Sequence, residues 1–306
     1  MVGRVTQGTL TSQLLRNINT NLSRSSELQE KLSTGRNLNR PSDDPVGITY
    51  ALRYRSELSI NERFQSNVDS ATSFLEFNDT LMSQISDVLK RAKELAVQGS
   101  TGTNPDVALE NISKEMQQLK QQLVDISNSQ LKGKYVFNGQ FTDKPPFDPT
   151  NPIASITDNG NLDYIINSGI TMTVNLSGNE VFGYPPPGIP APKNESDNAF
   201  VVLDNLIANL QAPNYAGVRA QIPLLESRLD KVLTQQAEVG ARTNRLQLVE
   251  GRLKDLSINL ESLQSKTEDA DFEQLIIQSK VNESVYQASL AVGSKIIAPT
   301  LVDFLR

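Results

Sequence analysis

Apolar residues recur at alternating steps of three and four positions over three long stretches of the chain. One series runs from Phe64 to Ala96 and includes Asn78 at one of its positions, and a second runs from Leu109 to Ile126. The third steps by sevens through Leu225, Val232, Val239, Leu246, Leu253 and Leu260. Heptad spacing places such residues on one face of a helix, so the pattern predicts three long helices that share a core.

Helix boundaries are marked by Gly, Pro and capping residues. Gly99 and Gly102 follow the first heptad series, and Asn104-Pro105-Asp106 offers an N-cap, a proline at the first helical position and an acid in the first turn of the next helix. Upstream, Gly35 ends a predicted helix, and Asp44-Pro45 predicts the start of another, with Asp44 as its N-cap.

The two ends of the chain carry a slightly different apolar repeat. Near the C-terminus Ile277, Val281, Val285, Ala288, Val292 and Ile296 step by four, four, three, four and four, an eleven-residue period. Near the N-terminus Leu14, Ile18, Leu22 and Ser25 step by four, four and three. We expect these two helices to pair through these stripes.

Such a pair would leave apolar side chains outside its contact. These residues are Leu10, Leu15, Leu275, Ile276, Leu290 and Ile297. A lone pair of amphipathic helices with a second apolar face is marginally stable in water. We therefore expect both arms to be disordered in a monomer and to become ordered when neighbouring copies cover them.

The middle of the chain has a different character. Residues 138–196 are rich in proline, and the run TMTVNL places Met172, Val174 and Leu176 on one face of a predicted strand. The predicted fold is mainly α, an elongated rod of coiled-coil-like helices with a small β-rich inserted domain. Its predicted domains are terminal arms (1–35 with 265–306), a helical rod (36–137 with 197–264) and the β-rich insertion (138–196).

Composition excludes most familiar active sites. The 306 residues include no cysteine and no histidine, so there is no thiolate, no imidazole base and no Cys/His zinc site. Lys and Arg number 29 against 35 Asp and Glu, and a net charge of −6 argues against nucleic acid as a partner. No apolar run is long enough to span a membrane, and the N-terminus lacks the pattern of a cleaved leader.

The segment STGRNLNRPSDDPVG (33–47) places hydroxyls, arginines and two adjacent carboxylates close together. The spacing of a phosphate-binding loop is missing, and capping by Asp44 is a better interpretation of Asp43-Asp44 than paired acid catalysis. In EDADFE (268–273), Gln274 stands where a calcium loop needs glycine, so this segment predicts a break between helices. We predict no catalytic, cofactor or metal site and no enzyme activity.

The two ends of the chain resemble the flagellin family of bacterial axial proteins. The N-terminal stretch contains the leucine-spaced helix, LSTG and PSDDP, and the C-terminal stretch is VYQASLAVGSKIIAPTLVDFL. GKYVFNGQFTDKPPF (133–147), NEVFG (179–183) and AEVGARTNRL (237–246) are more similar to members that join the flagellar hook to the filament than to filament subunits.

The resemblance implies a secreted structural protein that forms a homo-oligomeric ring between hook and filament. Its implied partners are a second hook-associated junction protein, flagellin, and a cytosolic export chaperone at the C-terminal helix. It implies type III export without a cleaved signal peptide. The predicted assembly residues are Leu14, Ile18, Leu22, Arg36, Arg40, Asp43, Asp44, Val281, Val285, Val292 and Ile296.

Two alternatives stay open at this point. The chain could be a filament flagellin, which would grow long filaments from a seed, whereas a junction subunit would stop after a few layers. It could also be a surface enzyme on a helical stalk, with residues 138–196 as its active part. Without His or Cys that enzyme would depend on Asp/Glu pairs, Ser/Lys or a bound metal, and no such cluster is evident in the insertion.

Overall fold

The computed structural model describes residues 7–102, 105–155, 157–185 and 196–297. The chain divides into two compact units, one of Met1–Ile60 with Leu256–Arg306 and the other of Asn61–Asp255. We call them the terminal unit and the central unit. The three-part division predicted from the sequence stays a prediction.

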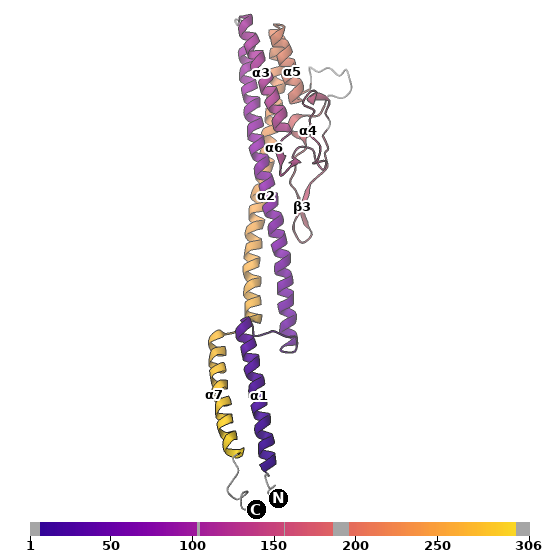
Figure 1. Ribbon diagram of the computed structural model, residues 1–306. Coiled ribbons are helices and arrows are strands. Elements are labelled where there is room, and N and C mark those ends of the chain that lie inside the picture. Colours follow the sequence, from indigo (N-terminus) through magenta and orange to yellow (C-terminus); the bar gives the residue numbers. More distant parts are fainter. Residues whose placement is uncertain (1–6, 103–104, 156, 186–195, 298–306) are drawn as a thin grey trace, which may run out of the picture. The chain divides into compact units, whose positions relative to one another are not determined.

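Helices dominate the described residues, and the strands are short (Figure 1). The helices are α1 (Gln7–Thr34), α2 (Pro45–Gly99), α3 (Asp106–Ser127), α4 (Gly178–Phe182), α5 (Ala199–Gln211), α6 (Tyr215–Glu268) and α7 (Phe272–Ile297), with a 3-10 turn at Pro152–Ala154. The strands are β1 (Gln130–Leu131), β2 (Lys134–Tyr135), β3 (Asp163–Asn167) and β4 (Ile170–Thr173). The predicted mainly α class with a small β-rich insertion is confirmed.

In the central unit the heptad residues form the core, as predicted. Five members of the third series, from Leu225 to Leu253, are buried in this core, and so are Val68, Leu75, Ile85 and Leu89 of α2. The sixth member, Leu260, is buried in the terminal unit. The portions of α2 and α6 in this unit lie side by side and antiparallel (Figure 1), linked by a 2.7 Å ion pair between Lys93 and Glu226.

Two asparagines on α2 are buried at this core. The Asn61 side-chain amide donates to the Leu253 carbonyl at 2.9 Å, and that of Asn78 donates to the Val174 carbonyl at 3.5 Å. Both side chains are almost fully buried. Because a buried amide without a partner is costly, each bond offsets part of the cost of burying an asparagine in this core.

The insertion packs on the helices through four phenylalanines. Phe137, Phe147, Phe182 and Phe200 are all buried, and their ring centroids lie 5.0 to 5.5 Å apart in the four contacting pairs. Phe200 belongs to α5, which packs against α3. This aromatic cluster ties the loops around α4 to the helical core.

Two antiparallel hairpins make up the regular β-structure of the described residues. The second pairs β3 with β4 through Asp163 opposite Thr173 and Tyr164 opposite Met172. Met172, Val174 and Leu176 are buried, but the strand ends at Thr173, so the predicted strand over 171–176 is too long. Beyond it the Asn175 side chain accepts from the Leu162 N–H at 2.8 Å and replaces the strand pairing.

The start of α3 differs by one residue from the sequence prediction. Pro105 holds the N-cap position with φ −65° and ψ 152°, and the helix begins at Asp106. Proline is therefore not the first helical residue here. Asn104, the predicted N-cap, lies outside the described residues. The other predicted boundaries at Gly99 and Pro45 are confirmed.

A buried arginine of α6 holds the two sides of the insertion's second half together. Arg228 donates to the Asp197 carbonyl at 2.9 Å and to its carboxylate at 2.7 Å, and also to the Glu180 carbonyl at 3.1 Å. Lys231 reaches the other Asp197 oxygen at 2.6 Å. The Arg228 side chain is 4% exposed and that of Lys231 is 56% exposed.

Asp197 stays ionised in this arrangement. Burial alone would raise its pKa, but the hydrogen bond from Lys231 and the charge of Arg228 outweigh burial and hold the pKa below its ordinary value of 3.8. Stabilisation by this carboxylate is therefore present above about pH 4 and is lost as the pH falls through the lowered pKa of the folded state.

Arg228→Ala and Lys231→Ala, as a matched pair, test the contacts that these two residues make with Asp197. We expect Arg228→Ala to lower the free energy of unfolding by about 3–5 kcal/mol, because it leaves a partly buried carboxylate and several carbonyls without their donor. Lys231→Ala should cost at most about 1 kcal/mol, as for other exposed ion pairs. Urea unfolding measures both, and equal losses would contradict the account.

Candidate functional site

In the terminal unit, α1 and α7 lie side by side in antiparallel directions (Figure 1). The Asn282 amide donates to the Asn21 carbonyl at 3.1 Å, and the Asn21 amide donates to the Ser289 hydroxyl at 3.4 Å. Nearer the end of α7, Gly293 faces Leu14, and a Cβ at Gly293 would lie 2.8 Å from a Leu14 methyl. The predicted pairing of the two helices is confirmed.

The face that α7 turns toward α1 is mostly polar or small. Its buried or half-buried positions step by four, three, four, three and four: they are Leu275, Ser279, Asn282, Tyr286, Ser289 and Gly293. We call this set the inner face. Small residues let helices approach closely, and the Asn and Ser side chains supply hydrogen bonds across the contact.

The apolar stripe predicted to make this contact faces away from it. We call Ile277, Val281, Val285, Ala288 and Val292 the outer stripe. Val281 is 57% exposed, Val285 45% and Val292 53%. The side chain of Ile296 lies outside the described residues. The sequence prediction was wrong about which stripe of α7 meets α1, because the inner face offers closer approach and partly buried hydrogen bonds.

On α1 the prediction was partly right. Leu14 is buried and Ile18 half-buried against α7, whereas Leu22 is 55% exposed and Asn21 occupies the contact in its place. Leu15 is also exposed, at 54%. Leu275, predicted to lie outside the contact, is buried within it. The terminal unit therefore presents uncovered apolar side chains on both helices.

The loop between α1 and α2 is held by local capping. Gly35 has φ +72° and its N–H donates to the Lys31 carbonyl at 2.9 Å, which ends α1 as expected for glycine after a helix. The Asp44 carboxylate accepts from the Val46 N–H at 3.0 Å, so Asp44 is the N-cap of α2, as predicted.

Arg40 and Asp43 are already engaged within the chain. The Asp43 carboxylate accepts from the N–H groups of Arg40 at 2.9 Å and Asn39 at 3.2 Å, and the Arg40 hydrogen bond in particular lowers the pKa of Asp43. The Arg40 guanidinium lies 2.7 Å from Glu30 of α1. These two predicted assembly residues therefore shape the loop.

Glu268, at the end of α6, connects three segments of the terminal unit and was not identified from the sequence. Its side chain is 1% exposed, and its carboxylate lies 2.7 Å from Arg55 of α2 and 3.7 Å from Arg36 of the loop. The Glu268 carbonyl accepts from the Asn37 N–H at 2.7 Å, and the Ala270 N–H donates to the Gly35 carbonyl at 3.1 Å.

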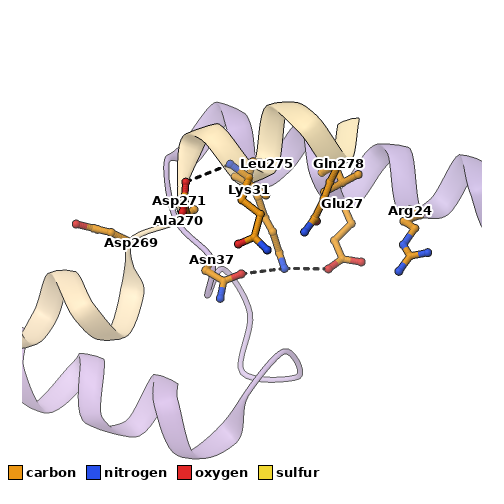
Figure 2. Close-up of a pocket in the computed structure, with 11 residues that line it drawn as sticks. Arg24, Glu27, Lys31, Asn37, Asp269, Ala270, Asp271, Leu275 and Gln278 are labelled. Atoms are coloured by element: carbon orange, nitrogen blue, oxygen red, sulfur yellow. Dashed lines mark hydrogen bonds and ion pairs between the residues drawn. The ribbon is translucent and has the colours of Figure 1, made fainter. Parts of the chain in front are cut away.

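A polar pocket of about 460 Å³ opens beside these contacts, between α1 and the start of α7 (Figure 2). Lys31 links Asn37, at 3.2 Å, with Glu27, at 3.1 Å, along one side of it. Asp271 begins α7 by accepting from the Leu275 N–H at 2.9 Å with its backbone carbonyl, which confirms the predicted helix break at 268–273. The pocket contains no base next to a nucleophile.

Nothing in the described part of the chain forms a metal-binding group of three or more His, Cys, Asp or Glu residues. Within the same residues, no helix combines the length and apolar character that a membrane crossing requires. What the terminal unit does offer is apolar surface on α1 and α7, and an ordered polar loop at the ends of these helices. This chemistry suits protein contacts.

A family model described as "Bacterial flagellin N-terminal helical region" matches residues 5–142. Flagellar hook-associated protein 3 of Salmonella typhimurium is 26% identical over 282 residues, which cover 86% of this chain and 87% of that protein. Flagellin of Bacillus subtilis is 27% identical over 290 residues, which cover 91% of each. Residues 5–142 of the chain thus match the N-terminal helical region of flagellins, and both of these relatives are flagellar proteins.

Solved structures of flagellar proteins share the fold of this chain. A putative flagellar hook-associated protein of Vibrio parahaemolyticus has a TM-score of 0.66 and 22% identity, covering 74% of this chain and all of that one. The flagellar junction protein FlgL of Legionella pneumophila has a TM-score of 0.58 and 17% identity, covering 73% and 100%.

The inner face of α7 and the contact of Glu268 with Arg55 are the features of this unit that the sequence pattern did not predict. The inner face has heptad spacing, so a second heptad series on α7 is the sequence signal that marks it. Glu268 and Arg55 carry no local pattern, because the chain folds back over two long helices before they meet.

Glu268→Ala tests the connection among α6, the loop and α2. We expect the free energy of unfolding to fall by about 1–3 kcal/mol, because Arg55 and Arg36 lose a buried carboxylate. Hydrogen exchange should show faster exchange at the Asn37 and Ala270 N–H groups. Glu261→Ala, on the exposed side of the same helix, is the control and should leave both amides protected. Equal exchange in the two variants would contradict the role of Glu268 in connecting these segments.

Gly293→Val tests the close approach of α1 and α7. Valine at this position would collide with Leu14, so we expect faster hydrogen exchange along the inner face. Gly251→Val makes the same change in α6, where a Cβ would meet nothing within 4 Å, and should not destabilise the helix, because valine has a somewhat higher helix propensity than glycine. If α7 amides are protected equally in the two variants, the described contact is not the one in solution.

Proposed function

We propose that this flagellar structural protein is a subunit of the junction between hook and filament, and that its copies assemble through the outer stripe of α7. The observation that carries the proposal is the division of α7 into two faces. The inner face is occupied by α1, whereas the apolar outer stripe is exposed. A family of polymerising proteins supplies a reason for such a surface.

Burial of the outer stripe would supply substantial free energy. A fully buried valine or isoleucine contributes about 1.5–3 kcal/mol relative to exposure. On α1, Leu15 and Leu22 are exposed and seven residues apart, the spacing of a coiled-coil position. We infer that helices of neighbouring copies cover both surfaces, and that the two arms gain full order only on assembly.

The loop contributes in a different way from that expected at first. Asp43, Asp44 and Arg40 fix the loop and the start of α2, so we infer that they position assembly surfaces. Arg36, with 46% of its side chain exposed, keeps capacity for a contact with a neighbouring copy.

Several finer assignments belong to the same proposal. The copies would form a ring between a second hook-associated junction protein and flagellin. A cytosolic export chaperone would cover the C-terminal helix before assembly, and the chain would leave the cell by the flagellar type III route without a cleaved signal peptide. We infer no catalytic activity for it.

Filament flagellin is the alternative within the family, since named relatives of both kinds match at similar identity, 26% and 27%. Junction membership is favoured by GKYVFNGQFTDKPPF, NEVFG and AEVGARTNRL. Seeding the purified protein separates the two: a junction subunit should add few layers, and growth of long filaments would favour the alternative.

The triple variant Val281→Gln, Val285→Gln and Val292→Gln tests the outer stripe. In cells that lack the natural gene it should abolish filament attachment and swimming, because polar side chains cannot replace the buried apolar contact. The unfolding midpoint of the soluble variant should stay unchanged, since these side chains are already exposed. Electron microscopy of the hooks and calorimetry are the measurements.

The control is Lys280→Gln with Glu283→Gln, which changes two exposed positions of the same helix outside the stripe. It should keep the cells motile. Normal filaments in the triple variant would overturn the assignment of the outer stripe. Protection of both terminal helices in the soluble monomer as strong as that of the central unit would separately overturn ordering on assembly.

A further inference from the structure

A groove in the central unit combines an apolar floor with a basic rim. It has a volume of about 420 Å³ and lies between α2 and the two hairpins. Phe74 of α2, Leu131, Leu162 and Tyr164 form the floor, and Lys132 and Lys134 lie at the rim. No carboxylate belongs to its lining. The four floor residues are only half-buried, so the floor is open to an occupant.

Lys132 holds an unusual backbone conformation for its residue type. With Gly133 it forms the two-residue turn between β1 and β2, and their φ angles are +53° and +80°. Asparagine and glycine are the residues that favour such a turn, and a side chain like that of lysine costs about 1–2 kcal/mol there. Neither Lys132 nor Lys134 forms an ion pair within the described residues. The turn thus carries a strained, unpaired positive charge.

The complementary chemistry lies a few residues along the same chain. Phe141 is 62% exposed, an uncommon state for such a large apolar ring, and Asp143 two residues later is exposed as well. Gln140 and Thr142 line the groove, but Phe141 between them does not. The ring therefore does not fill the groove of its own chain.

We propose that the groove binds Phe141 and Asp143 of a neighbouring copy. The ring would cover the apolar floor, and the carboxylate would lie between the two ammonium groups. An aromatic anchor in a pocket and charge complementarity at the rim are the features that give protein interfaces affinity and orientation.

The inference rests on the proposed assembly of copies, but it uses residues remote in sequence from the outer stripe. It assigns a role to the insertion, whose contacts the family resemblance leaves open. The hairpin of β3 and β4, which contributes Leu162 and Tyr164 at its base, lies beside α2 (Figure 1).

Disulfide trapping tests the contact directly, because the chain contains no cysteine. Full-length Ser73→Cys, carrying a tag, is mixed with untagged Phe141→Cys at high concentration and oxidised mildly. Ser73 lines the groove, so the mixed dimer should form several-fold more than with Val107→Cys, an exposed position of α3 away from the groove. A yield no higher than with Val107→Cys would overturn the proposal.

Substitutions give a second test with internal rescue. Sedimentation should show self-association weakened about tenfold or more by Phe141→Ala, as for other aromatic anchors, and unchanged by Val107→Ala. Lys132→Glu with Lys134→Glu should weaken association, and adding Asp143→Lys should restore it. Failure of this restoration would contradict the pairing of these charges and point to another partner for the groove.

The two proposals fail separately. If trapping stays at background while the outer-stripe variant still loses its filaments, the groove contact is wrong and the junction role stands. If trapping succeeds and the outer-stripe variant still builds filaments, the groove contact stands and assembly through α7 is wrong.

Discussion

A helix in a two-helix pair can bury only one stripe of its surface, and α7 carries two. The inner face makes the intramolecular contact although it is the less apolar, because Gly293 lets α1 approach closely and Asn282 forms a partly buried hydrogen bond with α1. The more apolar outer stripe is thereby exposed. The terminal unit is thus a helix pair whose most apolar surface, the outer stripe, is available to another molecule.

Periodicity predicted the helical core well because heptad spacing is a local property. The residues from Leu225 to Leu260 are buried as expected, and Asp44 caps α2 as expected. Partner choice was harder. Two stripes on α7 satisfied helical periodicity, and only the three-dimensional fit of Gly293 against Leu14 distinguishes them. Apolar content was a misleading guide because it does not measure how closely two backbones can approach.

Long-range polar contacts could not be predicted from the sequence for a related reason. Glu268 meets Arg55, 213 residues away, and Arg228 meets Asp197, 31 residues away. Each is one charged residue among many on a long helix, and nothing local marks it as buried. The segment 33–47 shows the reverse: it contains many groups suggestive of chemistry, yet its carboxylates mainly satisfy backbone N–H groups of their own loop.

The polar side-chain pairs between α2 and α6 have a kinetic consequence. A heptad pair is nearly degenerate, since sliding one helix by seven residues brings apolar side chains against apolar side chains again. The pairs Lys93–Glu226 and Gln236–Asp79 break that degeneracy, because a shift of seven residues moves the two partners about 10 Å apart along the helix axis. The native alignment of the two long helices is therefore more stable than alignments shifted by seven residues. Shifted pairs lose these polar contacts and should separate faster.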